Sequence, residues 1–479
     1  MAQTAFRTHR CGALTAAEQG REVRLGGWVH RLRDLGGIVF IDLRDRDGLV
    51  QLACDPEWTP ADVLTRAAAV GAESVVLVRG TVELRSEPAR DATMASRDVE
   101  VRVSALDIVG PAVTPAIPVA RRDGEQPASE ELRLQHRVLD LRRPELQNAL
   151  TLRHRLTQRA RQTLTGLGFL EIETPILTKP TPEGARDFLV PSRVHPGECY
   201  ALPQSPQIYK QLLMVAGFDR YFQIARCFRD EDLRADRQLE FTQIDLEASF
   251  VDQDDVIAVV EAVLRDQWAE AGATVATPFL RLPWREAMER FGIDKPDLRY
   301  GFELRDWTAH VAADAAPFVH DAIAAGGRLR GIIATGQGEL SRKEIDGLTA
   351  VAKSAGAGGL LWARRTAAGW EGQGVKAFGA AALDAVDAST GDLVVAAVGP
   401  DRITSPALHA VRMELVARPG VTPLTTHAFC WVVDFPLFEH DEETGRWVFT
   451  HHPFTSPHPD DLVHLDDAPE RCRALHYDA

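Results

Sequence analysis

The sequence predicts an α+β protein of several domains. Three observations carry this prediction: a β-rich N-terminal part with glycine turns, a later pair of strands that flank a highly charged loop, and an alanine- and glycine-rich stretch in which strands and helices alternate. The chain of 479 residues has room for two to four domains at about 150 residues each.

Residues 1–108 contain about five short, β-branched runs, which are separated by turns such as Gly26-Gly27 and Gly36-Gly37. A helix-like segment, 60–70, interrupts them. This pattern is typical of a small barrel, and five strands with one helical insert fit an oligonucleotide-binding (OB) fold. A small barrel with another ligand fits the pattern equally well.

Four prolines mark residues 109–143 as a linker or hinge, in which 130–142 has a helical pattern. A second helix is expected over 153–167.

Residues 144–300 form the first part of the next predicted domain. A strand over 172–177 is interrupted by Pro175, and the runs 221–228 and 241–250 predict an antiparallel hairpin with a long polar connection. The α/β stretch over 301–420 is predicted to be an inserted module. A strong strand pattern resumes at 430–436, so residues 421–479 are expected to return to the interrupted domain.

Composition excludes several classes of protein. The hydrophobic fraction of 45% and the charged fraction of 26% exclude long disorder, and no apolar run reaches the length of about 20 residues that a membrane span needs. With no apolar N-terminal leader, we expect a cytoplasmic protein. The net charge of −15 argues against indiscriminate coating of nucleic acid, but it leaves room for a local basic face. The six cysteines fit no zinc pattern and are expected to be reduced thiols.

The most informative segment is 226–247, RCFRDEDLRADRQLEFTQIDLE, which mixes four arginines with acidic residues between two strands. A charged loop is often merely solvated. Here Arg229 lies next to a strand end, where its guanidinium could bind a phosphate with two hydrogen bonds. A nucleotide site and a solvated loop both stay possible on these grounds.

This segment resembles the second signature motif of class II aminoacyl-tRNA synthetases, and its wording is similar to that of the bacterial-type aspartyl-tRNA synthetases. Further collinear segments carry the same resemblance across nearly the whole chain: WVHRLRDLGGIVFIDLRDRDGLVQ (28–51), ELRLQHRVLDLRRP (131–144), FLEIETPILTKPTPEGARDFLVPSR (169–193), YALPQSPQIYKQLLMVAGFDRYFQIARC (200–227), DKPDLR (294–299) and HHPFTSPHP (451–459).

The resemblance implies an aspartate–tRNA ligase with an OB-fold anticodon-binding domain, a class II antiparallel-sheet catalytic domain and the inserted bacterial-type module. ATP would activate L-aspartate to aspartyl-adenylate, with Mg²⁺ expected as cofactor, and tRNA would accept the aspartyl group. The implied partners are tRNA(Asp), in some members of the family also tRNA(Asn), and a second copy of the chain. Leu35 favours specificity for tRNA(Asp) alone, whereas Glu83 stands where some relatives carry a basic residue.

The resemblance also assigns residues at the active site. Arg229 would be catalytic and would bind both the α-phosphate of ATP and aspartate. The other implied aspartate-binding residues are Glu183, Gln207, Lys210, Asp245, His451 and His452. The other implied ATP-binding residues are Glu231, Gln238 and Phe241. Ordinary alternatives remain: Lys210 as a surface lysine, the two histidines as a zinc pair, and Asp245 in a structural salt bridge with an arginine.

In the barrel, Phe40 matches an aromatic residue that stacks on an anticodon base, and its polar companions are Arg31, Arg33 and Gln51. Packing of Phe40 in the barrel core is the alternative. Pro175 matches the proline of the first class II motif and predicts a homodimer interface; an edge-strand proline is the alternative.

A complete family member is expected to continue for about a hundred residues beyond 479. That segment would carry the magnesium ligands and the third class II motif. The residues at 421–479 would then be a truncated second part of the catalytic domain. The alternative function is therefore a truncated or inactive, synthetase-derived tRNA-binding protein.

Overall fold

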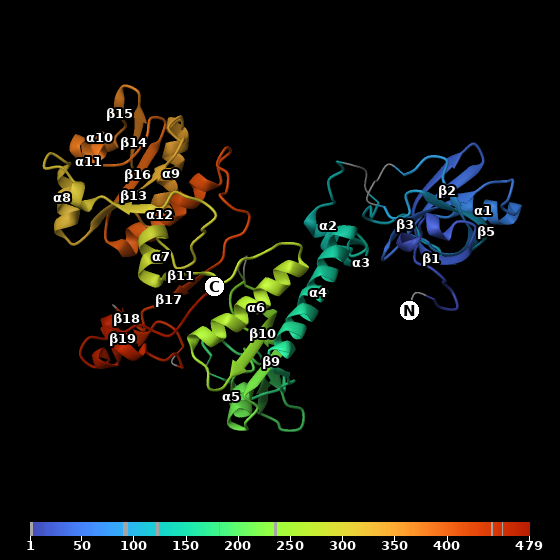
Figure 1. The fold of residues 1–479 in the computed structure, drawn as a ribbon, viewed down its shortest axis with the longest axis horizontal. Coiled ribbons are helices and arrows are strands. Elements are labelled where there is room, and N and C mark those ends of the chain that lie inside the picture. The colour runs from blue at the N-terminus through green and yellow to red at the C-terminus, as the bar shows by residue number, and fades with distance from the viewer. Residues whose placement is uncertain are drawn as a thin grey trace. The chain divides into compact units, whose positions relative to one another are not determined.

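The computed structural model describes residues 3–89, 94–120, 124–181, 183–233, 237–441, 444–452 and 454–479. They divide into two compact units, 1–156 and 157–479, and each unit is described by itself (Figure 1).

The first unit is a closed five-stranded barrel in the order β1-β2-β3-β5-β4. Neighbouring strands are antiparallel except for the parallel pair β3–β5, and α1 lies between β3 and β4 in the chain. The bounds are β1 Glu22–Leu35, β2 Ile38–Asp45, β3 Gly48–Cys54, α1 Ala61–Ala69, β4 Val75–Leu84 and β5 Val99–Gly110. This is the topology expected of an OB fold, so the open choice between barrel types is decided in its favour.

Alternation along β2 builds the barrel core. Val39, Ile41 and Leu43 are fully buried inside, whereas Phe40 and Asp42 lie between them on the outer face and are only half-buried. Phe40 is thus outside the barrel core.

Two short helices, α2 (Glu130–Gln135) and α3 (Arg137–Asp140), replace the single helix that was expected over 130–142. Buried Asp140 accepts hydrogen bonds from Arg137 at 2.9 Å and from Arg143 at 2.8 Å. Arg142 donates to Glu73 of the barrel at 2.9 Å and lies over the Trp28 ring, so charge pairing fixes α3 against the barrel. Helix α4 (Pro144–Gly166) begins nine residues earlier than expected because Pro144 suits a first helical turn.

The second unit contains the predicted hairpin, β9 (Arg220–Phe228) and β10 (Glu240–Ala248), with the two-residue strand β6 (Leu170–Glu171) parallel to β9. The strand expected over 172–177 is wrong: apart from the hydrogen bond from Ile172 N to Phe222 O, this segment leaves the sheet, and Pro175 has no N–H to donate. The other elements near the hairpin are β7 Leu189–Pro191, β8 Cys199–Ala201, α5 Gln207–Val215 and α6 Gln253–Glu270.

A second, five-stranded sheet in the order β12-β13-β16-β14-β15 lies between two layers of helices. Its central strands are almost wholly apolar because both faces are covered, by α9 and α12 on one side and by α10 and α11 on the other (Figure 1). The bounds are β12 Leu304–Asp306, α8 Pro317–Ala324, β13 Arg328–Ala334, α9 Arg342–Ser354, β14 Leu361–Thr366, β15 Gly369–Glu371, α10 Gly374–Phe378, α11 Ala380–Asp384, β16 Leu393–Gly399 and α12 Asp401–Val416.

After this sheet the chain returns to a strand that precedes it. β17 (Cys430–Val433) pairs in parallel with β11 (Leu280–Pro283), and α7 (Trp284–Phe291) follows β11 directly. Trp431 and Phe279 pack against α6, which joins this part to the hairpin. The remaining strands form a hairpin, β18 Phe438–Asp441 and β19 Arg446–Phe449.

Candidate active site

The two faces of the β9–β10 hairpin have different neighbours. Phe222 and Leu246 point to one face, where they pack against α4 and α6. Side chains directly opposite each other in the register share a face, so Tyr221, Gln223 and Cys227 of β9 lie with their β10 partners on the other side. Those partners are Glu247, Asp245 and Phe241.

Lys210 of α5 reaches this second face. Its ammonium group lies 2.7 Å from Asp245 Oδ1 and 3.5 Å from Glu247 Oε2. The side chains of Lys210 and Asp245 are only 12% and 7% exposed, so the pair is largely withdrawn from water. The partner of Asp245 is therefore a lysine, not an arginine, and Lys210 is not a plain surface residue.

The other carboxylate oxygen of Asp245, Oδ2, is buried and accepts no hydrogen bond from the described part of the chain. Burial, and next the Asp245 charge, raises the pKa of the neighbouring Tyr221 hydroxyl far above its ordinary value. That hydroxyl is neutral and donates to Gln223 Oε1 at 3.0 Å. Asp245 thus has one oxygen that is paired and one that is open to a donor.

Arg229 follows β9 and is held at both ends. Its backbone N–H donates to Leu239 O at 2.9 Å, and its guanidinium lies 5.2 Å from the centroid of the Phe241 ring. Its Nε is buried and has no partner among the described residues. A cation fixed in this way, with an unused donor, suits a phosphate or carboxylate oxygen.

Cys227, on the site face of β9 opposite Phe241, is fully buried. Burial, and next the charge of Asp245, raises the pKa of its thiol to about 11 against the opposing effects of Arg229 and Lys210. Glu183 also acts on the thiol. Four of the expected residues thus act electrostatically on one buried thiol.

Two hydroxyl groups orient Glu183. Thr181 Oγ1 donates to its Oε1 at 2.9 Å, and Ser205 Oγ donates to its Oε2 at 2.6 Å. Ser205 lies two residues before α5, which begins at Gln207, so Glu183 and the start of α5 are tied together.

The loop residues lie further out. Glu231 Oε2 accepts from Arg237 Nη1 at 2.7 Å, and Gln238 is exposed just before β10. Residues 234–236 of the charged loop, with its third arginine, lie outside the described residues.

His451 and His452 form a separate cluster. The His451 ring stacks on that of His476 at 3.8 Å and meets Phe435 edge-on. Burial lowers the pKa of His451. His452 Nδ1 accepts from Phe454 N at 3.2 Å. In the described chain, no hydrogen bond, ion pair or ring contact joins either histidine to the group around Lys210.

Pro175 is exposed, as are its neighbours Ile176 and Leu177. Thr174, just before it, donates from Oγ1 to Gln223 Oε1 at 2.9 Å, the same oxygen that Tyr221 uses. The proline segment is thereby attached to the site face of β9.

On the barrel, the expected residues meet on the outer face of three strands. Arg33 is directly opposite Phe40, and its Nη2 lies 2.7 Å from Asp42 Oδ1 and 3.2 Å from Gln51 Oε1. Gln51 Nε2 continues the chain of hydrogen bonds to Glu100 at 2.8 Å. Arg31, exposed, is opposite Asp42 in the register. Burial raises the pKa of Asp42, against the effect of Arg33.

Several of these residues are not marked as site residues by any motif in the sequence. Tyr221, Gln223 and Cys227 share the site face, and Asp42 and Glu100 complete the chain on the barrel. Strand alternation could have identified the residues of the hairpin, because the odd-numbered residues of β9 and β10 share the face of Asp245 once the hairpin is predicted.

Two further properties concern the part of the chain that the structure describes. It contains no group of three or more histidine, cysteine, aspartate or glutamate side chains able to hold a metal ion. It also contains no helix long and apolar enough to span a membrane. All six cysteines are free thiols, as expected.

Comparison with family models gives two matches. Residues 23–109 match the OB-fold nucleic acid binding domain, and residues 129–479 match tRNA synthetases class II (D, K and N).

Curated relatives are similar over 98% of this chain and about 80% of their own length. The Aspartate--tRNA(Asp/Asn) ligase of Geotalea uraniireducens is 49% identical over 98% of the chain and 80% of its own length. The Aspartate--tRNA ligase of Ruminiclostridium cellulolyticum is 46% identical, with 98% and 80% covered. The Aspartate--tRNA(Asp/Asn) ligase of Moorella thermoacetica is 48% identical, with 98% and 79% covered.

Among solved structures, asparaginyl-tRNA synthetase from Pyrococcus horikoshii, complexed with asparaginyl-adenylate, aligns with a TM-score of 0.50 at 19% identity, covering 89% of this chain and 100% of the other. This likeness concerns the fold alone. The family match over most of the chain and the relatives at 46–49% identity lead to one conclusion: the chain belongs to the class II tRNA synthetases of the aspartate, lysine and asparagine group.

Proposed function

We propose that the protein is an aspartate–tRNA ligase. The observation that carries this proposal is the buried pair of Lys210 and Asp245, on the hairpin face that also holds the Phe241 ring contacted by Arg229, in a chain whose relatives over nearly its full length are named aspartate–tRNA ligases. The first step joins L-aspartate to ATP, and the second passes the aspartyl group to tRNA.

The aspartate site follows from the charges. The Lys210 ammonium group would bind the side-chain carboxylate of the substrate, and the open Oδ2 of Asp245, with Glu183, would receive its ammonium group. In the free protein, Lys210 and Asp245 neutralise each other at 2.7 Å. A substrate that carries both charges replaces this internal pair without leaving a buried ion unpaired, which would be costly.

Arg229 and Phe241 form the nucleotide end. An oxygen of the aspartate α-carboxylate attacks the α-phosphorus of ATP, the bond to the bridging oxygen breaks, and pyrophosphate leaves with that electron pair. The Arg229 guanidinium stabilises the charge on the phosphoryl oxygens, and the Phe241 ring stacks on adenine. Gln207 is assigned to aspartate, and Glu231 and Gln238 to ATP. His451 and His452 stay proposed aspartate contacts that would need a further movement of their segment.

In the second step, a hydroxyl of the terminal ribose of tRNA attacks the aspartyl carbonyl carbon, and AMP leaves. The barrel would hold the anticodon, with Phe40 as the stacking surface and Arg31, Arg33 and Gln51 as hydrogen-bonding partners. The relatives' names support tRNA(Asp), and some of them support tRNA(Asn) as well.

The remaining assignments stay predictions. They are the division into 1–108, 109–143, 144–300, 301–420 and 421–479, the homodimer through Pro175, the cytoplasmic location, and Mg²⁺. Because the described residues form no metal-binding group, no Mg²⁺ ligand is assigned and no step depends on one.

The test is aspartate-dependent exchange of pyrophosphate into ATP, followed by charging of tRNA(Asp). We expect both activities in the wild type, and we expect Lys210→Met to abolish exchange while anticodon binding persists. tRNA binding without any exchange in the wild type would overturn the proposal in favour of an inactive tRNA-binding protein.

A further inference from the structure

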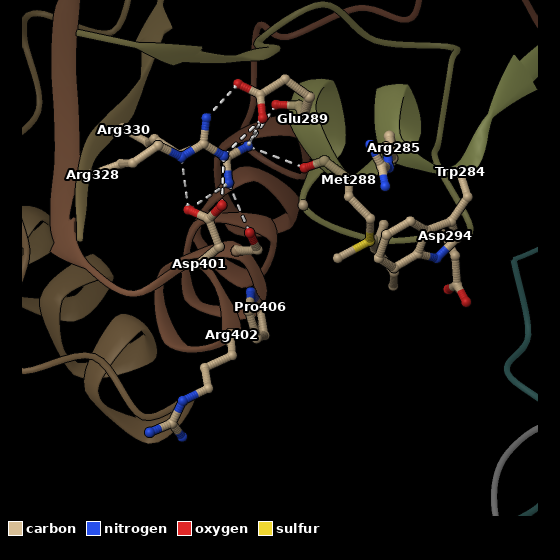
Figure 2. Close-up of a pocket in the computed structure, with 13 residues that line it drawn as sticks. Trp284, Arg285, Met288, Glu289, Asp294, Arg328, Arg330, Asp401, Arg402 and Pro406 are labelled. Atoms are coloured by element: carbon tan, nitrogen blue, oxygen red, sulfur yellow. Dashed lines mark hydrogen bonds and ion pairs between the residues drawn. The ribbon is translucent and has the colours of Figure 1, made fainter. Parts of the chain in front are cut away.

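A cavity of about 650 Å³ lies where α7 meets β13 and α12, and none of the residues assigned to the proposed reaction lines it (Figure 2). Its size is within the range of small-molecule sites, about 300–1,000 Å³. Its apolar lining comes from Trp284, Met288, Ile293 and Pro406. An indole, a thioether and a proline ring in the lining favour a ligand with a planar apolar part, such as an aromatic ring.

Ion pairs on one side of the cavity fix its shape. Arg328 binds Glu289 at 2.8 Å and Asp401 at 2.6 Å, and all three line the cavity (Figure 2). Arg330, only 1% exposed, donates to Ser405 Oγ at 2.8 Å and to the backbone oxygen of Glu289 at 2.6 Å. These contacts join α7, β13 and α12, so the cavity is preformed.

The backbones of α7 and α12 also approach each other closely. Gly292, at the end of α7, has φ +70°, and a Cβ there would lie 2.5 Å from Ser405 O. Only glycine allows this approach, and it sets the distance between the two helices at the cavity.

Some charged groups of the lining are not used by these contacts. Arg285 and Arg402 are exposed and make no ion pair or hydrogen bond with the described residues, and Arg330 Nε is buried without a partner. Asp294 is the one acid of the lining without such a partner, and it lies beside Trp284, across from Arg402 (Figure 2). In a chain of net charge −15, the balance of unpaired groups here is positive.

We propose that this cavity is a binding site for a small anion with a planar apolar body. The ring would lie against Trp284, Met288 and Pro406, and the anionic group would face Arg402 and the α12 side. Such a ligand would contact both α7 and α12 and would stabilise their junction by mass action. The proposal does not depend on the proposed function, and its test needs no activity.

The test is fluorine NMR of the whole protein labelled with 5-fluorotryptophan, with the Trp284 resonance assigned from Trp284→Phe. Three probes share one ring system and differ in charge: 1-naphthoate, 1-naphthamide and 1-naphthylmethylammonium. We expect 1-naphthoate to shift the Trp284 resonance with a Kd of about 1 mM or below. We expect the neutral and cationic probes to bind at least about fivefold more weakly.

Arg402→Gln should weaken 1-naphthoate binding about fivefold, whereas the matched control Arg305→Gln should leave it unchanged. Arg305 is an exposed arginine on β12 that does not line the cavity. Equal binding of all three probes would overturn the anion preference. No shift of Trp284 with any probe, or equal effects of the two arginine variants, would overturn the site.

Discussion

The outer face of the barrel and the site face of the β9–β10 hairpin both gather polar side chains on neighbouring strands, but they differ in burial. Arg33, 47% exposed, binds Asp42, which is 23% exposed. The Lys210–Asp245 pair is almost fully withdrawn from water. Charge removal is costly where water cannot compensate, so the site face of the hairpin should respond strongly to substitution and the outer face of the barrel weakly.

The largest effect is expected for Asp245→Asn, which leaves Lys210 without its partner. Breaking a buried pair costs about 3–5 kcal/mol, so kcat/KM for aspartate in pyrophosphate exchange should fall about a thousandfold. Glu240→Gln is the control, because Glu240 pairs with Arg226 at 3.1 Å in an exposed position. Activity of Asp245→Asn within tenfold of the wild type would show that burial of the Lys210–Asp245 pair does not make it more sensitive to substitution.

Arg229→Lys keeps the positive charge but replaces the planar guanidinium group with an ammonium group. We expect exchange to fall about a hundredfold, because a lysine cannot make two parallel hydrogen bonds to the phosphate. Arg226→Lys, on the opposite face of β9, should retain nearly full activity. Equal losses in the two variants would show that Arg229 has no specific role.

The barrel also contains a buried charged residue, Arg44. Arg44 donates to His30 Nδ1 at 2.7 Å, and burial, then Arg44, lowers the pKa of His30 to about 4. Because the folded pKa is below the ordinary 6.5, the neutral form stabilises the fold above pH 6.5, and this stability is lost as the pH falls from 6.5 towards 4. The loss should reach about 3 kcal/mol.

Hydrogen exchange of barrel peptides, measured between pH 7 and pH 4.5 and corrected for the intrinsic exchange rate, would test this effect. His30→Gln should reduce the acid-induced loss of protection, and His9→Gln, in the same unit, should not. An unchanged pH dependence in His30→Gln would assign the acid sensitivity elsewhere, for example to Glu73, whose pKa is lowered mainly by its hydrogen bonds and ion pairs with Arg44 and Arg142 despite the opposing effect of burial.

The smallest effect is expected on the barrel's outer face. Phe40→Ala should raise the KM for tRNA about tenfold, since stacking on one base contributes about 1–3 kcal/mol, and should leave pyrophosphate exchange unchanged. Phe6→Ala is a suitable control, because Phe6 is 68% exposed elsewhere in the same unit. Unchanged charging kinetics in Phe40→Ala would exclude the stacking role.

Much of this organisation follows from local patterns. The alternation of Val39, Ile41 and Leu43 predicts a barrel strand, and the runs around the charged loop predict the hairpin, because both signals lie within a few neighbouring residues. The class II synthetase fold and the OB barrel are both confirmed by the family matches.

Other features depend on contacts that no local pattern contains. The segment 172–177 has strand-like residues but departs from the sheet after Ile172, and the partner of Asp245 comes from a helix 35 residues earlier in the chain. The cavity between α7 and α12 depends on residues more than a hundred positions apart. Periodicity could not indicate these long-range contacts.

We propose that Lys210 and Asp245 form a site for aspartate, and amino-acid selectivity in pyrophosphate exchange tests this assignment most directly. The full chain should be assayed with L-aspartate, L-asparagine and L-lysine, the substrates that distinguish the three branches of its family. We predict that kcat/KM for L-aspartate exceeds the other two by at least about a thousandfold, because a buried lysine without a negative partner is strongly disfavoured. Equal or greater exchange with L-asparagine or L-lysine would contradict the account.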